Sequence, residues 1–191
     1  VRADRAGDGD GGTRAWAWGR RLRDAGAVYA EAGTVVAPAA WEADVIGVDL
    51  GRHMLKVRTY LRIAAQLAEL STCLRMRVGV VLLRADGSVA GMGYNGALPG
   101  APHCTPDLCN PSVRCLNTRH AERSALDYSD GKVQTACVTH EPCRRCTLDL
   151  IARGVRAIYW RHPYASEAAG ERAAKMRVIK QHLVLWTQID G

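Results

Sequence analysis

The alternation of apolar and polar residues changes period along the chain and so marks out its helices and strands. Apolar residues recur at helical spacing from about residue 54 to residue 70, which predicts a helix there. The run Val78–Leu83 is apolar and rich in β-branched residues, which is typical of a buried strand. Asp86-Gly87 then favours a hairpin turn, and Val89–Met92 predicts the returning strand.

Farther along the chain, strand patterns alternate with helical ones. Between the strand Val89–Met92 and these later patterns, residues 94–118 are rich in Pro, Gly and Cys, which predicts a long ordered loop. Strands that alternate with helices indicate an α/β fold, in which helices pack on a sheet. We predict helices over His120–Tyr128, Pro142–Ala152 and Glu167–Lys180, and strands over Val133–Thr139, Val155–Trp160 and Leu183–Trp186.

The N-terminal quarter of the chain shows no comparable period. Residues 1–20 are rich in Gly, Asp, Arg and Ala, a composition typical of a disordered or weakly ordered arm. Trp16, Trp18 and Trp41 suggest that part of this region packs on the domain. We therefore expect an N-terminal extension over residues 1–50, partly disordered or packed on the core, and one globular domain over residues 51–191.

Composition narrows the class of protein. The 191 residues are 48% hydrophobic and 24% charged, as in ordinary globular domains. There is no run of about 18 apolar residues, which argues against a transmembrane helix. The first 20 residues also lack the apolar segment of a secretory signal, so we expect a cytoplasmic protein without a membrane partner.

Net charge and cysteine content each leave two interpretations open. A net charge of +7 suits a nucleic-acid or phosphate partner, but it equally suits a basic surface with no specific partner. The seven cysteines, in a chain without signs of export, favour metal binding or free thiols over a disulfide framework. The spacing of the cysteines therefore has to decide between metal binding and free thiols.

The decisive motif is His120-Ala121-Glu122, followed later by a Cys-x-x-Cys pair, Cys143 and Cys146, that opens a predicted helix. A catalytic zinc ion takes three protein ligands and leaves its fourth position to water, and His120, Cys143 and Cys146 are three suitable ligands. The helix N-terminus and the metal both favour thiolates at the two cysteines.

Glu122 lies two residues beyond His120, where it can reach the water without binding the metal. It can take a proton from that water and pass it to a leaving amine. A lone Cys-x-x-Cys is also typical of a redox pair, and a purely structural zinc site would have no use for Glu122. The combined order, with Pro before the first Cys, is the signature of zinc nucleobase deaminases.

The chain resembles the cytidine deaminase superfamily and, within it, the deoxycytidylate (dCMP) deaminases. His120-Ala121-Glu122 and the Cys-x-x-Cys pair identify only the superfamily, whereas the preceding loop narrows the match. The resemblance covers roughly residues 56–165. Its further matching segments are Ser71-Thr72-Cys73, Val78-Gly79, Gly93-Tyr94-Asn95-Gly96, Leu98–Cys104, and the spaced Cys109 and Cys115.

The resemblance implies a three-layer α/β/α sandwich with a central mixed five-stranded sheet. It also implies hydrolytic deamination of dCMP to dUMP by a zinc-activated water, which would supply dUMP for thymidylate synthesis. Glu122 would be the catalytic residue, and Asn95 and the backbone of Ala121 would bind substrate. Asn95 is equally typical of a turn before Gly96, and both roles are compatible.

The remaining cysteines have two interpretations. Some dCMP deaminases carry a second, structural zinc, and the resemblance assigns Cys73, Cys104, Cys109 and Cys115 to it, with His103 as a possible substitute ligand. Four thiolates would close such a site completely, and a metal would fasten the long loop. The alternative is that these four are ordinary reduced thiols. Cys137 lies in a predicted strand and is expected to be a core residue.

The resemblance also implies regulation and assembly. Several family members respond to dCTP and dTTP with Mg²⁺ through the loop that corresponds to Tyr94, Asn95 and Gly96. They commonly form hexamers, so we expect a homo-oligomer, either hexamer or dimer.

Departures from the family pattern at Asn117, Ser124 and His140 surround the site and leave the exact substrate open. The candidates for binding a 5′-phosphate are Arg75, Arg77, Arg119 and Arg123.

Two competing functions remain. One is deamination of another cytosine nucleotide or nucleoside, including a modified dCMP. The other is nucleic-acid editing of the tRNA adenosine deaminase kind, which acts on a base extruded from its stack. The loop from Cys104 to Cys115 favours a mononucleotide enzyme, so a nucleic-acid partner is not expected.

Overall fold

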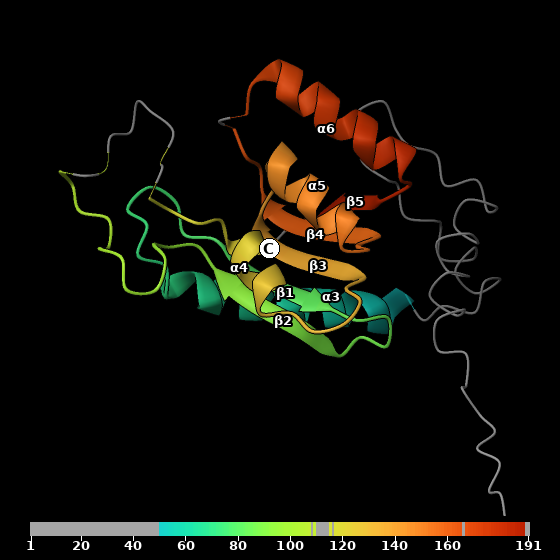
Figure 1. The fold of residues 1–191 in the computed structure, drawn as a ribbon. Coiled ribbons are helices and arrows are strands. Elements are labelled where there is room, and N and C mark those ends of the chain that lie inside the picture. Colours follow the sequence, from blue (N-terminus) through green and yellow to red (C-terminus); the bar gives the residue numbers. More distant parts are fainter. Residues whose placement is uncertain (1–49, 108, 110–114, 116, 166, 190–191) are drawn as a thin grey trace, which may run out of the picture.

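The computed structural model describes residues 50–107, 109, 115, 117–165 and 167–189. These residues form a five-stranded sheet with helices on both faces (Figure 1). The predicted N-terminal extension therefore lies outside the described residues except for Leu50, the first residue of helix α3 (Leu50–Glu69). Within the described part of the chain, no helix combines the length and apolar character needed to cross a membrane.

The sheet is mixed, as the resemblance implied. Its order is β2-β1-β3-β4-β5. β1 pairs antiparallel with β2 and β3, whereas β3, β4 and β5 run parallel. The predicted three-layer α/β/α sandwich is confirmed. The strands are β1 (Gly79–Leu83), β2 (Val89–Tyr94), β3 (Thr135–His140), β4 (Ala157–His162) and β5 (Leu185–Gln188).

One face of the sheet is covered by α3. This helix presents Val57, Leu61 and Ala64 to Val81 and Leu83 of β1 in one apolar cluster. The helix begins four residues before the predicted start near residue 54, because polar residues at its beginning weaken the apolar pattern there.

The other face is covered by three shorter helices, α4 (Ala121–Asp127), α5 (Arg144–Ala152) and α6 (Ala169–Gln181). The intervening side chains of β1, Val80 and Leu82, join the apolar cluster on this side. Successive residues of β1 thus enter opposite cores, which explains why the strand is apolar throughout.

The connections bring two helix N-termini to one edge of the sheet. β3 ends at His140 and leads into α5, while the loop before α4 is joined to the end of β2 by a bridge between Gly96 and Arg119. β1 runs antiparallel to β3, so its first residue, Gly79, donates its N–H to Thr139 Oγ1 at 3.1 Å. The segments that carry the predicted chemistry therefore converge.

Candidate active site

The three predicted zinc ligands lie together between α4 and α5. His120 directly precedes α4, Cys143 directly precedes α5, and Cys146 lies in the first turn of α5. Their donor atoms all lie within 4.8 Å of one another. The Sγ atoms of Cys143 and Cys146 are 3.7 and 3.3 Å from Nδ1 of His120.

This donor set fits a tetrahedral zinc ion. Typical Zn–S and Zn–N bond lengths with tetrahedral angles place a sulfur and a nitrogen ligand about 3.6 Å apart, close to both measured separations. Among the described residues, no other group of three His, Cys, Asp or Glu side chains meets in this way. The set supplies three ligands, which leaves a fourth position for water.

The two thiols share their protons unequally. Hydrogen bonding from Cys146, and secondarily from His120, lowers the pKa of Cys143 to about 3 against the opposing effect of burial. The hydrogen bond to Cys143, together with burial, raises the pKa of Cys146. One thiolate is therefore already favoured, and a divalent cation can take the place of the proton held by the other.

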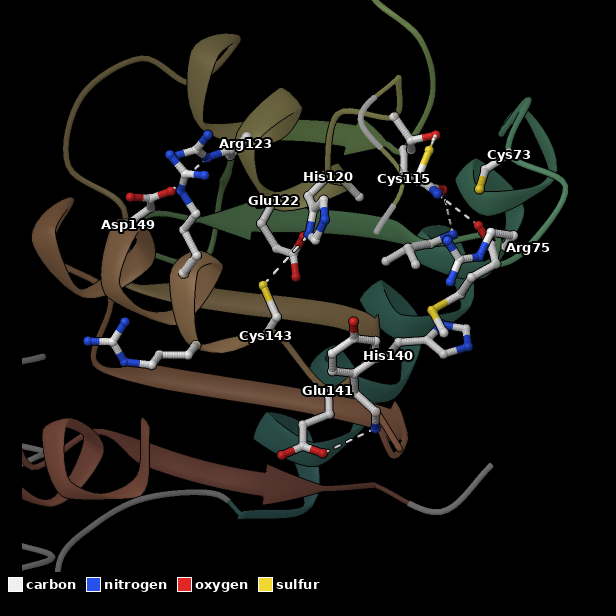
Figure 2. A pocket seen from close by; sticks show the side chains of 18 of the residues that line it. Cys73, Arg75, Cys115, His120, Glu122, Arg123, His140, Glu141, Cys143 and Asp149 are labelled. Atoms are coloured by element: carbon white, nitrogen blue, oxygen red, sulfur yellow. Dashed lines mark hydrogen bonds and ion pairs between the residues drawn. The ribbon is translucent and has the colours of Figure 1, made fainter. Parts of the chain in front are cut away.

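Glu122 lies in the first turn of α4 and is 4% exposed. Burial raises the pKa of its carboxyl, and the negative charge of Cys143 adds to this, whereas His120 opposes it. Figure 2 shows Glu122 and Cys143 facing His120. A carboxyl with a raised pKa beside a metal site is suited both to accept and to return a proton.

A pocket of about 1000 Å³ opens in front of these residues. Ala121, a predicted substrate contact, is buried and lines it. Arg75 and Arg123 lie on opposite sides of His120 in Figure 2. The four arginines that line the pocket, called here the arginine rim, are Arg75, Arg123, Arg144 and Arg145.

The arginine rim agrees only in part with the sequence candidates for phosphate binding. Arg123 also binds Asp149, with Nε 2.8 Å from Oδ2. Arg119 instead forms an ion pair with Asp127, and neither Arg119 nor Arg77 lines the pocket. Sequence reasoning missed Arg144 and Arg145, although their place between the two cysteine ligands was a usable signal.

Asn95 has a structural role that its sequence position did not reveal. It is buried at the end of β2, where its Oδ1 accepts the Ser71 hydroxyl at 2.7 Å and the Val78 N–H at 2.8 Å. Its Nδ2 donates to the Met76 carbonyl at 2.7 Å. Asn95 thus fastens the segment before β1 to β2 and also lines the pocket. Its predicted contact with substrate stays a prediction.

The other predicted regulatory residues lie beside Asn95. Tyr94 is 41% exposed, and Gly96 exchanges two backbone hydrogen bonds with Arg119, at 2.8 and 3.2 Å. Gly96 therefore anchors the segment that leads to His120. A regulatory nucleotide site at Tyr94, Asn95 and Gly96 stays a prediction.

The cysteines assigned to a second zinc are brought together only in part. Cys104 and Cys115 both contact Oγ1 of Thr118, at 3.6 and 3.3 Å. Cys73 and Cys115 line the same pocket, but the four predicted sulfurs, including that of Cys109, do not all lie within 4.8 Å of one another. A second zinc stays a prediction.

Cys137 behaves as the sequence predicted. It is fully buried in β3, and burial raises the pKa of its thiol to about 12.

Of the three departures from the family pattern, His140 lines the pocket, whereas Asn117 and Ser124 do not. Asn117 donates to the Pro102 carbonyl at 3.1 Å and so holds the long loop. The Ser124 hydroxyl donates to the His120 carbonyl at 3.4 Å, one turn back along α4. His140 lines the pocket and stacks on His162 with ring centroids 5.0 Å apart, and burial lowers its pKa.

Comparison with known proteins agrees with this geometry. The model of the family described as the cytidine and deoxycytidylate deaminase zinc-binding region matches residues 54–162. The chain belongs to this family. The matched range contains His120, Glu122, Cys143 and Cys146, so the family's zinc-binding region coincides with the cluster built above.

Two relatives illustrate the similarity in sequence. ComE operon protein 2 of Bacillus subtilis (strain 168) is 38% identical over 112 residues, which are 53% of this chain and 59% of that protein. Deoxycytidylate deaminase of Mycobacterium phage D29 is 34% identical over 117 residues, which are 53% of this chain and 90% of the phage protein. The chain thus spans less than two thirds of the Bacillus protein but most of the phage one.

Solved structures share the fold. The dCMP deaminase of cyanophage S-TIM5 in apo form has a TM-score of 0.55 and 25% identity, covering 70% of this chain and 96% of that one. The same enzyme in complex with dCMP and dUMP has a TM-score of 0.58 and 24% identity, and the match covers 69% of this chain and 95% of that one.

Proposed function

We propose that this chain is a zinc-dependent hydrolase that converts dCMP to dUMP and ammonia. The observation that carries the proposal is the meeting of His120, Cys143 and Cys146 beside buried Glu122 at a pocket with an arginine rim. The similarity to the phage deoxycytidylate deaminase, 90% of which the match covers, supports dCMP as the substrate.

The chemistry of the site follows from its groups. Zinc bound by the three ligands would act as a Lewis acid that lowers the pKa of a water molecule. Glu122 accepts a proton as the oxygen of that water attacks C4 of the base. Glu122 delivers this proton to N3, then takes the second proton from the hydroxyl now on C4 and passes it to the 4-amino group, which leaves as ammonia as its bond to C4 breaks. One water is thus consumed for each ammonia released. Burial suits Glu122 to this exchange because it raises the carboxyl pKa.

The arginine rim fits the phosphate of a mononucleotide. Guanidinium groups bind phosphate oxygens through paired hydrogen bonds, and Arg75, Arg144 and Arg145 line the same pocket as the proposed zinc ligands. We propose that the base enters toward Glu122 while the phosphate is held by arginines of this rim. The product dUMP would then be available for thymidylate synthesis.

We also propose a second, structural zinc held by Cys73, Cys104, Cys109 and Cys115. The shared contact of Cys104 and Cys115 with Thr118 supports this, because it brings two of the four cysteines to one side chain. Native mass spectrometry of the purified chain is expected to find two zinc ions per chain. One zinc per chain would leave these cysteines as reduced thiols.

Regulation and assembly belong to the same proposal. Exposed Tyr94, with Asn95 and Gly96, would bind dCTP or dTTP with Mg²⁺ in a cytoplasmic homo-oligomer, either hexamer or dimer. Sedimentation of the chain with and without dCTP and Mg²⁺ measures the assembly, and a monomer under both conditions would contradict it.

A substrate panel tests the proposed activity. The zinc-loaded chain is incubated with dCMP, CMP, deoxycytidine, dCTP and a tRNA anticodon stem-loop while ammonia release is followed. We expect the highest kcat/KM with dCMP, and loss of turnover after zinc is removed by a chelator. Turnover of the RNA without turnover of dCMP would overturn the proposal, and preference for another cytosine compound would correct the substrate.

A further inference from the structure

A group of buried charges that the mechanism does not use lies directly behind Cys143. Lys175 of α6 is fully buried, and its Nζ lies 2.8 Å from Oε1 of Glu141 and 2.6 Å from Oε2 of Glu167. Both carboxylate side chains are only 2% exposed. We call these three residues the Lys175 cluster. Arg172 adds a second cation, 3.4 Å from Glu141 Oε2.

The Lys175 cluster holds the backbone on both sides of Cys143. Lys175 Nζ donates to the Pro142 carbonyl at 3.1 Å, and Glu167 Oε1 accepts the Arg144 N–H at 2.6 Å. These two groups belong to the peptide bonds immediately before and after Cys143. Both peptide planes that set the direction of the Cys143 side chain are therefore fixed by side chains from outside the motif.

The position of Cys143 explains why an outside acceptor is needed. The first N–H groups of a helix have no partner within the helix, and a side chain just before it commonly supplies the acceptor. Here Cys143 occupies that place and directs its sulfur to His120. Glu167 supplies the acceptor instead, and its negative charge also suits the positive end of α5.

Lys175 completes the arrangement by neutralising the carboxylates. A carboxylate buried as deeply as Glu167 or Glu141 is costly unless a cation and hydrogen bonds compensate it. Lys175 contacts both and lies 5.3 Å from the centroid of the Trp186 ring, so packing on the sheet limits where its ammonium group can move. The backbone around Cys143 is thereby tied to β5 and α6.

We propose that Lys175 and Glu167 are positioning residues that aim the Cys143 sulfur at the zinc site. This inference rests on the proposed function, in that zinc is the metal bound by His120 and the two cysteines. Loss of either residue is expected to loosen Cys143, one of the three proposed zinc ligands. We expect His120 and Cys146 to keep their places, because the bonds of Lys175 and Glu167 to the backbone lie on either side of Cys143.

Zinc affinity is the first test, measured on the full chain by competition with a chromogenic chelator. Glu167→Leu removes the acceptor and the charge, and we expect it to lose about 10–100-fold in zinc affinity, as other outer-shell changes do. Glu167→Gln keeps an oxygen that can accept the Arg144 N–H, so it should recover much of this loss. Lys175→Met should resemble Glu167→Leu.

The matched control is Leu61→Ala on the opposite face of the sheet. Leu61 is a fully buried residue of α3, so this variant loses stability without touching the proposed zinc ligands. Zinc affinity within twofold of the original is expected for Leu61→Ala. If Leu61→Ala lost zinc as readily as Glu167→Leu, the effect would be one of general stability and the inference would be wrong.

Cobalt substitution reports the thiolate ligands independently of activity. The thiolate-to-cobalt charge-transfer band should weaken in Glu167→Leu and stay unchanged in Leu61→Ala. Unchanged zinc affinity and an unchanged band in Glu167→Leu would overturn the inference while leaving the proposed function intact. Failure of the unaltered chain to bind zinc would instead overturn the proposed function. If Lys175→Met does not fold, the two Glu167 variants decide, because they leave Lys175 paired with Glu141.

Discussion

The two faces of the sheet differ in what their helices do. Beneath α3 the core is almost entirely apolar, and the polar contacts there include the bond between His53 and the Tyr159 hydroxyl at 2.8 Å. Beneath α4, α5 and α6 the core also contains buried charges, namely Glu122, Glu141 and Lys175. The first face supplies packing, whereas the second combines packing with the proposed chemistry.

The lengths of the helices reflect this difference. α3 has 20 residues, whereas α4 and α5 have seven and nine, too few to be stable alone. α4 and α5 depend on tertiary contacts, and each begins at a proposed zinc ligand. The proposed site thus uses the N-termini of two short helices. The other face is covered by one long helix, which has only one N-terminus. Four predictions test this difference between the faces.

Glu122→Gln should have the largest effect on activity. The amide keeps the size of the side chain but cannot carry the proton, so we expect kcat to fall by at least about 10²–10⁴-fold. Zinc content, measured by atomic emission, should be unchanged because Glu122 is not one of the proposed ligands. The control is Glu69→Gln, at an exposed position at the end of α3; this variant should keep the kcat of the original protein. A Glu122→Gln protein with the original rate would contradict the mechanism.

Leu61→Ala should have the largest effect on the α3 face. Removing a fully buried Leu leaves a cavity and should lower the free energy of unfolding by about 2–5 kcal/mol. Urea denaturation measures this loss. Under conditions where the protein remains folded, kcat and KM for dCMP should be unchanged, since the proposed zinc ligands and Glu122 lie at the starts of α4 and α5, on the other face. A fall in kcat without unfolding would show that the two faces are coupled.

One glycine on each face of the sheet lets a helix pack closely, Gly93 under α4 and Gly79 under α3, so the two positions can be compared directly. A Cβ at Gly93 would lie 2.5 Å from the Ala125 nitrogen of α4, and one at Gly79 would collide with the Ala64 carbonyl of α3. Gly93→Ala and Gly79→Ala should each lower the free energy of unfolding by about 1–3 kcal/mol. Only Gly93→Ala should also lower kcat, because α4 carries Glu122.

Gly170→Ala is the control for this pair. A Cβ there meets nothing within 4 Å, so stability should hold or rise by up to about 1 kcal/mol. Equal losses of kcat in Gly93→Ala and Gly79→Ala would remove the distinction between the faces.

The smallest effect concerns pH. Burial, and secondarily the charge of Lys56, lowers the pKa of His53 below its ordinary 6.5. Below pH 6.5 the unfolded chain binds a proton that the folded chain does not, so the free energy of unfolding falls as pH drops from 7.5 to 5.5. His53→Gln should lessen this fall. Urea denaturation at both pH values measures it, and an equal or steeper fall in the variant would contradict the assignment.

His140 provides the same comparison on the pocket side. Its pKa is lowered by burial and by His162, so His140, like His53, makes the free energy of unfolding fall as pH drops. His140→Leu should therefore also lessen the fall. Both variants keep the proposed zinc ligands, so protonation of the ligands affects all the proteins alike and cancels in the difference.

Much of the fold could be predicted from the sequence because it is encoded in local patterns. The apolar run of β1 and the alternation after residue 133 predicted each strand to within two or three residues. The helix ends were predicted as closely, except at the start of α3, where the apolar pattern weakens before the helix does. The proposed ligands were predicted because His-x-Glu and Cys-x-x-Cys spacings reflect the coordination of the metal itself.

The rest could not be predicted because it depends on contacts between segments far apart in the sequence. Nothing local to Lys175 indicates burial, since Lys is common on exposed helix faces and only the packing of α6 over α5 places it under Cys143. Asn95 likewise suited a turn, and only the fold showed that it fastens the segment before β1.

The sequence by itself therefore determined the fold class and predicted the three proposed zinc ligands and Glu122 as the proposed proton carrier, because each is encoded in residue type and short-range spacing. Only the tertiary structure decided which arginines face the pocket, which face of the sheet carries the charges, and how the backbone at Cys143 is held. Those features depend on the pairing order of the strands and on helix packing, which bring together residues that no local pattern relates.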